Sequence, residues 1–311
     1  MDVQGTCAPG FDGVRAALAD NLEQGKDVGA CAAVTVDGQL VADVWGGHQD
    51  EARTTPWERD TIINVWSTTK TMAALSMLTL VGRGEVDVDA PVATYWPEFK
   101  AGGKENVLVR HIMSHTAGLS GWQEPMKPED LYDWDLACAR LAAQEPWWEP
   151  GTASGYHAIS QGYLEGEVVR RVTGQTIGTF FAQEIAGPLG ADFHIGTGPE
   201  HDARVAKVIP PPPLVPEGME IDMTSVAMRT LTNPPLDAAQ SWTEPWRRAE
   251  IPAAGGHGNA RSVALVQSIL ACGGESNGVR VFSEETANIV FREQCNGIDL
   301  VLGVPLSHGI G

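Results

Sequence analysis

A serine and a lysine three positions apart give the strongest chemical signal in this sequence. Ser67-Thr68-Thr69-Lys70 is an S-x-x-K motif. Residues i and i+3 share one face of a helix, so the lysine amine can reach the serine hydroxyl. That hydroxyl is a weak nucleophile until a base removes its proton, and burial would lower the pKa of the lysine toward the range where it acts as a base. The spacing predicts Ser67 as nucleophile and Lys70 as its base, although a serine-capped core helix also fits the motif.

A tyrosine in a glycine-rich loop is the third candidate catalytic residue. Tyr156 lies within residues 151–158, where two glycines allow the loop to present the phenol into a cleft. A nearby lysine ammonium would make the phenol more acidic, so that it could carry a proton from Ser67 to the leaving group. Without Ser67, the simpler interpretation is a tyrosine that anchors a loop. We predict Tyr156 as catalytic and the adjacent His157 as substrate-binding.

Metal and nucleotide cofactors are not expected. His111 and His115 are four residues apart, but Ile112 stands where a zincin has its glutamate, and no third ligand is evident. We therefore predict histidines packed against the core and no metal site. The sequence contains no G-x-G-x-x-G, P-loop or G-x-S-x-G nucleophile elbow, which disfavours a nucleotide-binding protein or an α/β-hydrolase.

A further histidine lies in a short glycine-flanked stretch. His257 stands between Gly256 and Gly258, and Asn259 is a natural N-cap for the helix that follows. We interpret this stretch as structural and close to the rim of the active site, with His257 as a second substrate-binding candidate.

Composition limits the class of protein. The 311 residues are 43% hydrophobic and carry a formal net charge of -19. Such a surface repels phosphate backbones and anionic lipid, so we expect a small-molecule substrate and neither a nucleic-acid nor a membrane partner. The five cysteines form no CxxC pair, and the first residues carry an acid instead of the basic start of a signal peptide. We predict a cytoplasmic protein whose oligomeric state the sequence leaves open.

Several elements must position these residues. Residues 28–36 and 39–45 read as strands joined by Asp37-Gly38, a strong hairpin signal. Residues 62–65 read as a strand that leads into an apolar helix over 67–81, as expected in the centre of a domain. The pattern from about residue 107 to 190 is mainly helical. This order predicts an α/β (α+β) fold: one catalytic domain over 1–311, with a sheet portion of about 1–85 and 250–311 and a helical portion of about 86–249.

The chain resembles the serine β-lactamase-like superfamily, in its class C β-lactamase and family VIII carboxylesterase branch. The similar stretches follow the family's order over nearly the whole chain and are residues 34–47, 64–70, 87–92, 109–119, 148–151, 155–158, 187–190 and 258–262. The resemblance implies that Ser67 is acylated, that Lys70 is its base partner and that Tyr156 is the general acid and base. It also implies an antiparallel sheet flanked by helices, with a mostly helical second region.

Two departures from the family pattern matter. Class C β-lactamases carry Tyr-x-Asn, in which the asparagine holds the β-lactam side-chain amide, whereas Ala158 stands here. The family's third motif, on a late strand that supplies the second oxyanion donor, has no counterpart: neither 256–258 nor 308–310 falls at its place, and residues 302–311 resemble the stretch just before it. We expect the closing strands to be missing and the sheet edge beside the Ser67 helix to be open.

The sequence thus predicts a carboxylesterase that acts on short-chain, uncharged esters through an acyl-enzyme on Ser67, without a cofactor. The alternatives are β-lactam or amide hydrolysis or acyl transfer on the same scaffold. A third alternative is an inactive, truncated remnant.

Overall fold

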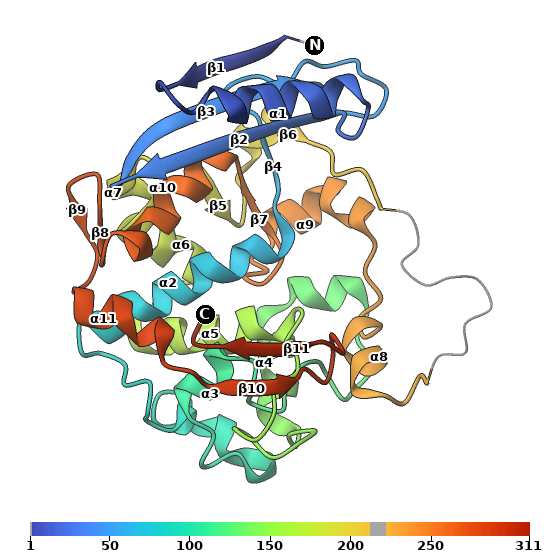
Figure 1. Cartoon of the computed structure of the whole chain (residues 1–311). Coiled ribbons are helices and arrows are strands. Elements are labelled where there is room, and N and C mark those ends of the chain that lie inside the picture. Colours follow the sequence, from blue (N-terminus) through green and yellow to red (C-terminus); the bar gives the residue numbers. More distant parts are fainter. Residues whose placement is uncertain (1, 212–221) are drawn as a thin grey trace.

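The computed structural model describes residues 2–211 and 222–311 (Figure 1). The strands are β1 (Val3–Cys7), β2 (Gly29–Val36), β3 (Gln39–Gly47), β4 (Ile62–Asn64), β5 (Phe193–Ile195), β6 (Val205–Ala206), β7 (Gly256–Gly258), β8 (Glu275–Ser276), β9 (Val279–Arg280), β10 (Cys295–Ile298) and β11 (Pro305–His308). The α-helices are α1 (Asp12–Glu23), α2 (Thr69–Gly82), α3 (Val109–Met113), α4 (Trp134–Ala143), α5 (Ser160–Thr173), α6 (Ile177–Phe181), α7 (Gly187–Leu189), α8 (Val226–Leu231), α9 (Glu244–Arg248), α10 (Ala260–Ala271) and α11 (Glu284–Asn288). This mixture of sheets flanked by helices confirms the predicted fold class.

A three-stranded antiparallel sheet has the order β1-β3-β2. The predicted hairpin turn joins β2 to β3, with φ of 50° at Asp37 and 74° at Gly38, and two positive φ values are typical of a turn that matches the twist of a hairpin. On one face, Leu18 and Leu22 of α1 pack against Val44. Side chains alternate between the two faces along a strand, so neighbouring residues of β2 and β3 point to the opposite face of the sheet. Residues of α10 contact the sheet on that face.

Strand β2 is an edge strand within the described part of the chain, where it pairs only with β3. A groove of about 590 Å³ runs beside it, lined on the other side by residues of β4, β7 and α10. The sequence predicts this open edge.

A second sheet of four short strands has the order β5-β7-β4-β6. Strand β7 pairs antiparallel with β4 and β5, and β6 runs parallel to β4. Strands β5 and β6 lie within residues 86–249, which we expected to be helical. They carry two or three residues each and pair with strands that come from far apart in the sequence.

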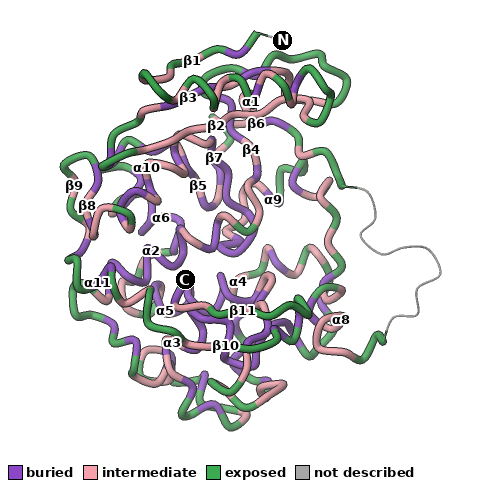
Figure 2. Tube along the Cα trace, viewed as in Figure 1, coloured by how far each residue is buried: buried purple, intermediate pink, exposed green. Residues whose placement is uncertain are grey.

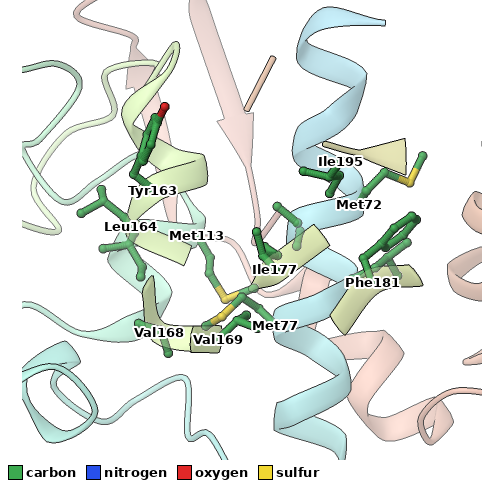
Figure 3. Close-up of a cluster of buried hydrophobic side chains, with 14 of the residues drawn as sticks. Met72, Met77, Met113, Tyr163, Leu164, Val168, Val169, Ile177, Phe181 and Ile195 are labelled. Atoms are coloured by element: carbon green, nitrogen blue, oxygen red, sulfur yellow. The ribbon is translucent and has the colours of Figure 1, made fainter. Parts of the chain in front are cut away.

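Helix α2 crosses the middle of the molecule, as its apolar pattern predicts. Every residue from Met72 to Leu80 is at most 4% exposed. Its side chains Met72 and Met77 pack among residues of α5 and α6, including Val169 and Phe181 (Figure 3). Figure 2 shows the same pattern, with buried segments gathered around α2 and α5 and exposed segments at the periphery. The core therefore holds the helix that begins just after Ser67.

The last residues form a hairpin of β10 and β11 beside α3 and α5, not in either large sheet (Figure 1). Gly311 N–H donates to Met113 O at 2.9 Å, and Leu300 N–H donates to Ser154 O at 2.9 Å. The expectation that residues 250–311 belong to the sheet portion is therefore wrong for this hairpin, which packs on the helical portion. None of the helices that the structure describes is long and apolar enough to cross a membrane.

Candidate active site

A strained turn delivers Ser67 from strand β4 to helix α2. Trp66 has a φ of 47°, the left-handed region that bulky side chains avoid. Its ring packs against Trp246, with ring centroids 5.3 Å apart, and the neighbouring Val65 N–H donates to Gly256 O at 2.9 Å. These contacts hold the backbone in the strained conformation. Ser67 then lies exposed in a 3₁₀ turn at the start of α2.

The amine of Lys70 is buried directly beneath the serine. Its Nζ lies 3.1 Å from Ser67 Oγ, 2.7 Å from Ala158 O and 2.9 Å from Ala253 O. A neutral amine has two N–H groups and one lone pair, so the two carbonyl oxygens can take both N–H groups and leave the lone pair for the serine O–H. Burial lowers the pKa of Lys70 to about 7, with the charge of Glu165 acting in the opposite direction. The lysine can therefore act as a base near neutral pH.

The phenol of Tyr156 lies on the other side of the serine. Its hydroxyl oxygen is 2.6 Å from Ser67 Oγ, and the Nζ of Lys70 lies 4.8 Å from the centre of its ring. Burial raises the pKa of Tyr156, and the hydrogen bond with Ser67 only partly opposes this effect. The net shift is opposite to the expected acidification of this phenol by the lysine, because desolvation of the phenolate dominates. At neutral pH the site thus combines a lysine that can lose its proton and a tyrosine that keeps its own.

The two predicted substrate-binding histidines are buried, with no exposed surface. The Nδ1 of His157 lies 2.6 Å from Gly155 O, and its Nε2 accepts the Leu119 N–H at 3.2 Å. The Nδ1 of His257, in β7, lies 2.9 Å from Gly255 O. Burial lowers the pKa of both to about 4, so they are neutral. Both rings contact the backbone around the site, and the assignment of His157 and His257 as substrate-binding residues stays a prediction.

His115 contacts the tyrosine directly. Its ring centroid is 4.9 Å from that of Tyr156, its φ is 59°, and its Nδ1 accepts the His157 N–H at 3.1 Å. Burial lowers its pKa well below the ordinary value, so the ring is neutral. Within residues 2–211 and 222–311 no group of His, Cys, Asp and Glu side chains is arranged to hold a metal ion.

Two buried carboxyl groups near the site escaped the sequence-based prediction. Glu165 on α5 is fully buried, and its Oε1 accepts from Gln161 Nε2 at 2.9 Å, whereas its Oε2 has no partner in the described part of the chain. Burial raises its pKa to about 8. Glu165 stands four residues after Gln161, on a helix face that is otherwise apolar. This spacing was a sequence signal from which its burial could have been predicted. Asp299 bonds to the backbone of Tyr156 from 143 positions away, and no local pattern indicates that contact.

Comparison with known proteins indicates the family of the chain. The profile of the Beta-lactamase family matches residues 14–311. The chain is 37% identical to the Mycobacterium tuberculosis protein "Esterase/beta-lactamase LipL" over 99% of this chain and 74% of that one. Among solved structures, "Crystal structure of a family VIII carboxylesterase" superposes with a TM-score of 0.93 at 43% identity, covering 99% of this chain and 82% of that one.

A penicillin-binding protein homolog from Caulobacter crescentus superposes with a TM-score of 0.91 at 37% identity, again over 99% and 82% of the two chains. The family profile covers nearly all of the sequence, and the resemblance read from the motifs is confirmed. The chain belongs to the beta-lactamase family.

Proposed function

We propose that this protein is a carboxylesterase that hydrolyses short-chain, uncharged esters through an acyl-enzyme on Ser67. One observation carries the proposal: Ser67 Oγ lies between a buried amine at 3.1 Å and a protonated phenol at 2.6 Å. That arrangement supplies a base and an acid to the same oxygen. Relatives named as an esterase and a family VIII carboxylesterase support the ester as substrate.

The first half of the reaction forms the acyl-enzyme. Neutral Lys70 takes the proton of Ser67 as Oγ attacks the ester carbonyl, and the carbonyl π electrons move to oxygen. The N–H of Ser67 lies in the first turn of a helix, where donors lack intrahelical acceptors, so it can stabilise the oxyanion. When the intermediate collapses, Tyr156 gives its proton to the leaving alcohol and regains one from the Lys70 ammonium.

The second half releases the acid. A water molecule gives a proton to the neutral Lys70–Tyr156 pair as it attacks the acyl carbonyl. The bond to Ser67 Oγ then breaks, and the proton returns to that oxygen. The enzyme is restored with one ester and one water converted into one acid and one alcohol.

Amide or β-lactam hydrolysis is the second candidate, because two relatives carry the name beta-lactamase, one of them together with esterase. Ala158 favours the ester. Its carbonyl oxygen bonds to Lys70, and its methyl side chain offers no hydrogen bond to a β-lactam side-chain amide. We expect kcat/KM for p-nitrophenyl butyrate to exceed that for nitrocefin. A larger value for nitrocefin would reverse the order of the two candidates.

Labelling with a fluorophosphonate, followed by intact-mass measurement, tests the nucleophile. The wild type should gain one adduct and lose ester hydrolysis, whereas Ser67→Ala should neither form the adduct nor hydrolyse the ester, because it lacks the reacting oxygen. Ser283→Ala is the matched control: Ser283 is also exposed at a helix start, but its Oγ caps α11 at 3.2 Å from Thr286 N and has no lysine partner. Labelling that persists in Ser67→Ala would place the nucleophile elsewhere, and an unlabelled wild type would favour the inactive remnant. A cytoplasmic location stays a prediction that cell fractionation can test.

A further inference from the structure

The turn between the last two strands is built against the loop that carries Tyr156. Residues 299–304 form this turn, closed by the Asp299 N–H to Val304 O at 3.0 Å and the Gly303 N–H to Asp299 O at 2.9 Å. The Tyr156 loop, residues 151–158, belongs to no helix or strand. Since no ladder of hydrogen bonds fixes this loop, its position depends on contacts from elsewhere.

Asp299 supplies two of those contacts. Its side chain is only 1% exposed and accepts four hydrogen bonds. Two come from its own turn, the N–H groups of Val301 and Leu302, both at 2.9 Å. The other two come from the Tyr156 loop: Ser154 Oγ at 2.9 Å and the Tyr156 N–H at 3.1 Å.

The carboxylate is ionised despite its burial. Burial raises the pKa of Asp299, but the hydrogen bonds from backbone N–H groups and from Ser154 outweigh it, so the pKa lies below its usual range. A buried anion is costly unless it is fully hydrogen-bonded. The Tyr156 loop therefore cannot move away from the turn without leaving this charge partly unsatisfied.

Three successive backbone N–H groups of the Tyr156 loop donate hydrogen bonds to residues outside the loop. The Gly155 N–H donates to His115 O at 3.0 Å, and the His157 N–H donates to His115 Nδ1 at 3.1 Å. Between them, the Tyr156 N–H donates to the Asp299 carboxylate. His115 thus fixes the two neighbours, and Asp299 fixes the residue whose hydroxyl faces Ser67.

We propose that Asp299 is a positioning residue that holds the Tyr156 hydroxyl at hydrogen-bonding distance from Ser67 Oγ. The inference rests on the proposed function, in which Tyr156 protonates the leaving alcohol. Asp299 acts only through the tyrosine, since its four partners lie in the two loops. A misplacement of about 1 Å in a reacting group can cost about 100-fold in rate.

The informative variant is Asp299→Ser. A serine hydroxyl can still bond to the N–H two residues on and preserve the turn, but it is too short to reach the Tyr156 loop as well. We expect kcat for ethyl butyrate to fall by about 100-fold with KM nearly unchanged. Asp299→Asn, whose side-chain oxygen can still accept the Tyr156 N–H, should recover most of that loss.

The choice of leaving group separates positioning from a general loss of structure. An ethanol leaving group needs the proton from Tyr156, whereas p-nitrophenolate leaves without one. Asp299→Ser should therefore slow ethyl butyrate far more than p-nitrophenyl butyrate, as Tyr156→Phe should. Asp133→Ala, which removes a carboxylate that accepts the Leu136 N–H at the start of α4, should leave the ratio of the two rates unchanged. Equal losses on both esters in Asp299→Ser would overturn the proposal.

A double variant gives the decisive measurement. If Asp299 acts through the tyrosine, Asp299→Ser should add little to the loss that Tyr156→Phe already causes on ethyl butyrate. A further loss of about 100-fold in the double variant would show an independent role and contradict the inference. Failure of the proposed function looks different, because Ser67→Ala would then keep its ester hydrolysis whatever Asp299 does.

Discussion

The ammonium group of an ordinary lysine, with a pKa of about 10.4, would be a poor base at neutral pH. Here the surroundings of Lys70 make its amine a base. Burial removes water and lowers the pKa of Lys70, and two carbonyl oxygens accept the N–H groups of the neutral amine. The same desolvation keeps Tyr156 protonated. The sequence predicts which residue types meet Ser67, but their pKa values depend on burial, which the motif does not encode.

The dependence of ester hydrolysis on pH should follow from these two groups. Lys70 must be neutral, so kcat/KM should rise as pH increases through about 7 and then stay level. It should not fall until the pH exceeds about 10, the ordinary pKa of tyrosine, because burial raises the pKa of Tyr156. A pH–rate profile with p-nitrophenyl butyrate measures both limits.

Glu165→Gln tests the origin of the acidic limb. Burial raises the pKa of Glu165 to about 8, so its carboxyl is largely protonated at the pH where Lys70 titrates, and the neutral amide of Glu165→Gln should move the acidic limb little. Glu149→Gln, at an exposed carboxyl before the Tyr156 loop, should also leave the limb in place. A limb that moves to clearly lower pH in Glu165→Gln, but not in Glu149→Gln, would show instead that Glu165 is ionised beside Lys70.

At the scale of elements, the sequence predicts what local patterns encode. The hairpin at Asp37-Gly38 and the apolar helix after Ser67 are both present, because turn chemistry and hydrophobicity act over a few residues. The pairing of β5 and β6 with β4 and β7 could not be predicted, since strands of two or three residues show no periodicity. The place of the last hairpin was also missed, because its contact with Ser154 depends on the tertiary fold.

The candidate site also has features that the sequence predicts and features that it does not. The structure brings Ser67, Lys70 and Tyr156 within hydrogen-bonding distance, and their catalytic roles stay predictions. The burial of His157 and His257 could not be predicted, because positions close to glycines resemble exposed loops, whereas close packing encloses both rings. Their neutral imidazoles support the backbone around the site.

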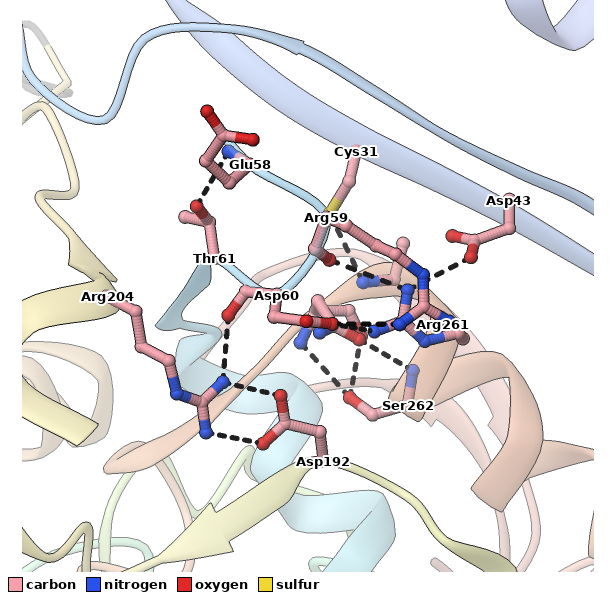
Figure 4. Close-up of polar contacts among 12 residues, drawn as sticks. Cys31, Asp43, Glu58, Arg59, Asp60, Thr61, Asp192, Arg204, Arg261 and Ser262 are labelled. Carbon is pink, nitrogen blue, oxygen red and sulfur yellow. Dashed lines mark hydrogen bonds and ion pairs between the residues drawn. The ribbon is translucent and has the colours of Figure 1, made fainter. Parts of the chain in front are cut away.

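At the scale of the whole molecule, one ionic network connects the two sheets. Arg261 of α10 bonds to Asp43 of β3 at 3.0 Å and to Asp60, just before β4, at 2.9 Å (Figure 4). Arg204 continues the network from Asp60 O, at 2.8 Å, to the carboxylate of Asp192 beside β5. The network therefore runs from the three-stranded sheet to the four-stranded sheet that supports the Ser67 turn.

Replacing the central arginine should weaken the fold without changing the chemistry. The side chains of Arg261 and Asp43 are 11% and 15% exposed, so Arg261→Gln would leave Asp43 with little solvent and no cation. Removal of one partner from a fully buried ion pair costs about 3–5 kcal/mol, and with Asp60 open to water we expect a loss of about 2–3 kcal/mol in the free energy of unfolding. Urea unfolding measures this loss, and kcat at 25 °C should be nearly unchanged because the network does not touch Ser67, Lys70 or Tyr156.

Arg59 provides the matched control for this prediction. It pairs with the same Asp60 at 3.1 Å, but its side chain is 57% exposed, and exposed ion pairs contribute at most about 1 kcal/mol. Arg59→Gln should therefore shift the urea midpoint little. The double variant Arg261→Gln with Asp43→Asn should recover part of the loss, because it removes the unpaired charge as well. If Arg261→Gln and Arg59→Gln unfolded at the same urea concentration, packing of α10 on β2 and β3, not the ion pairs, would hold the two sheets together.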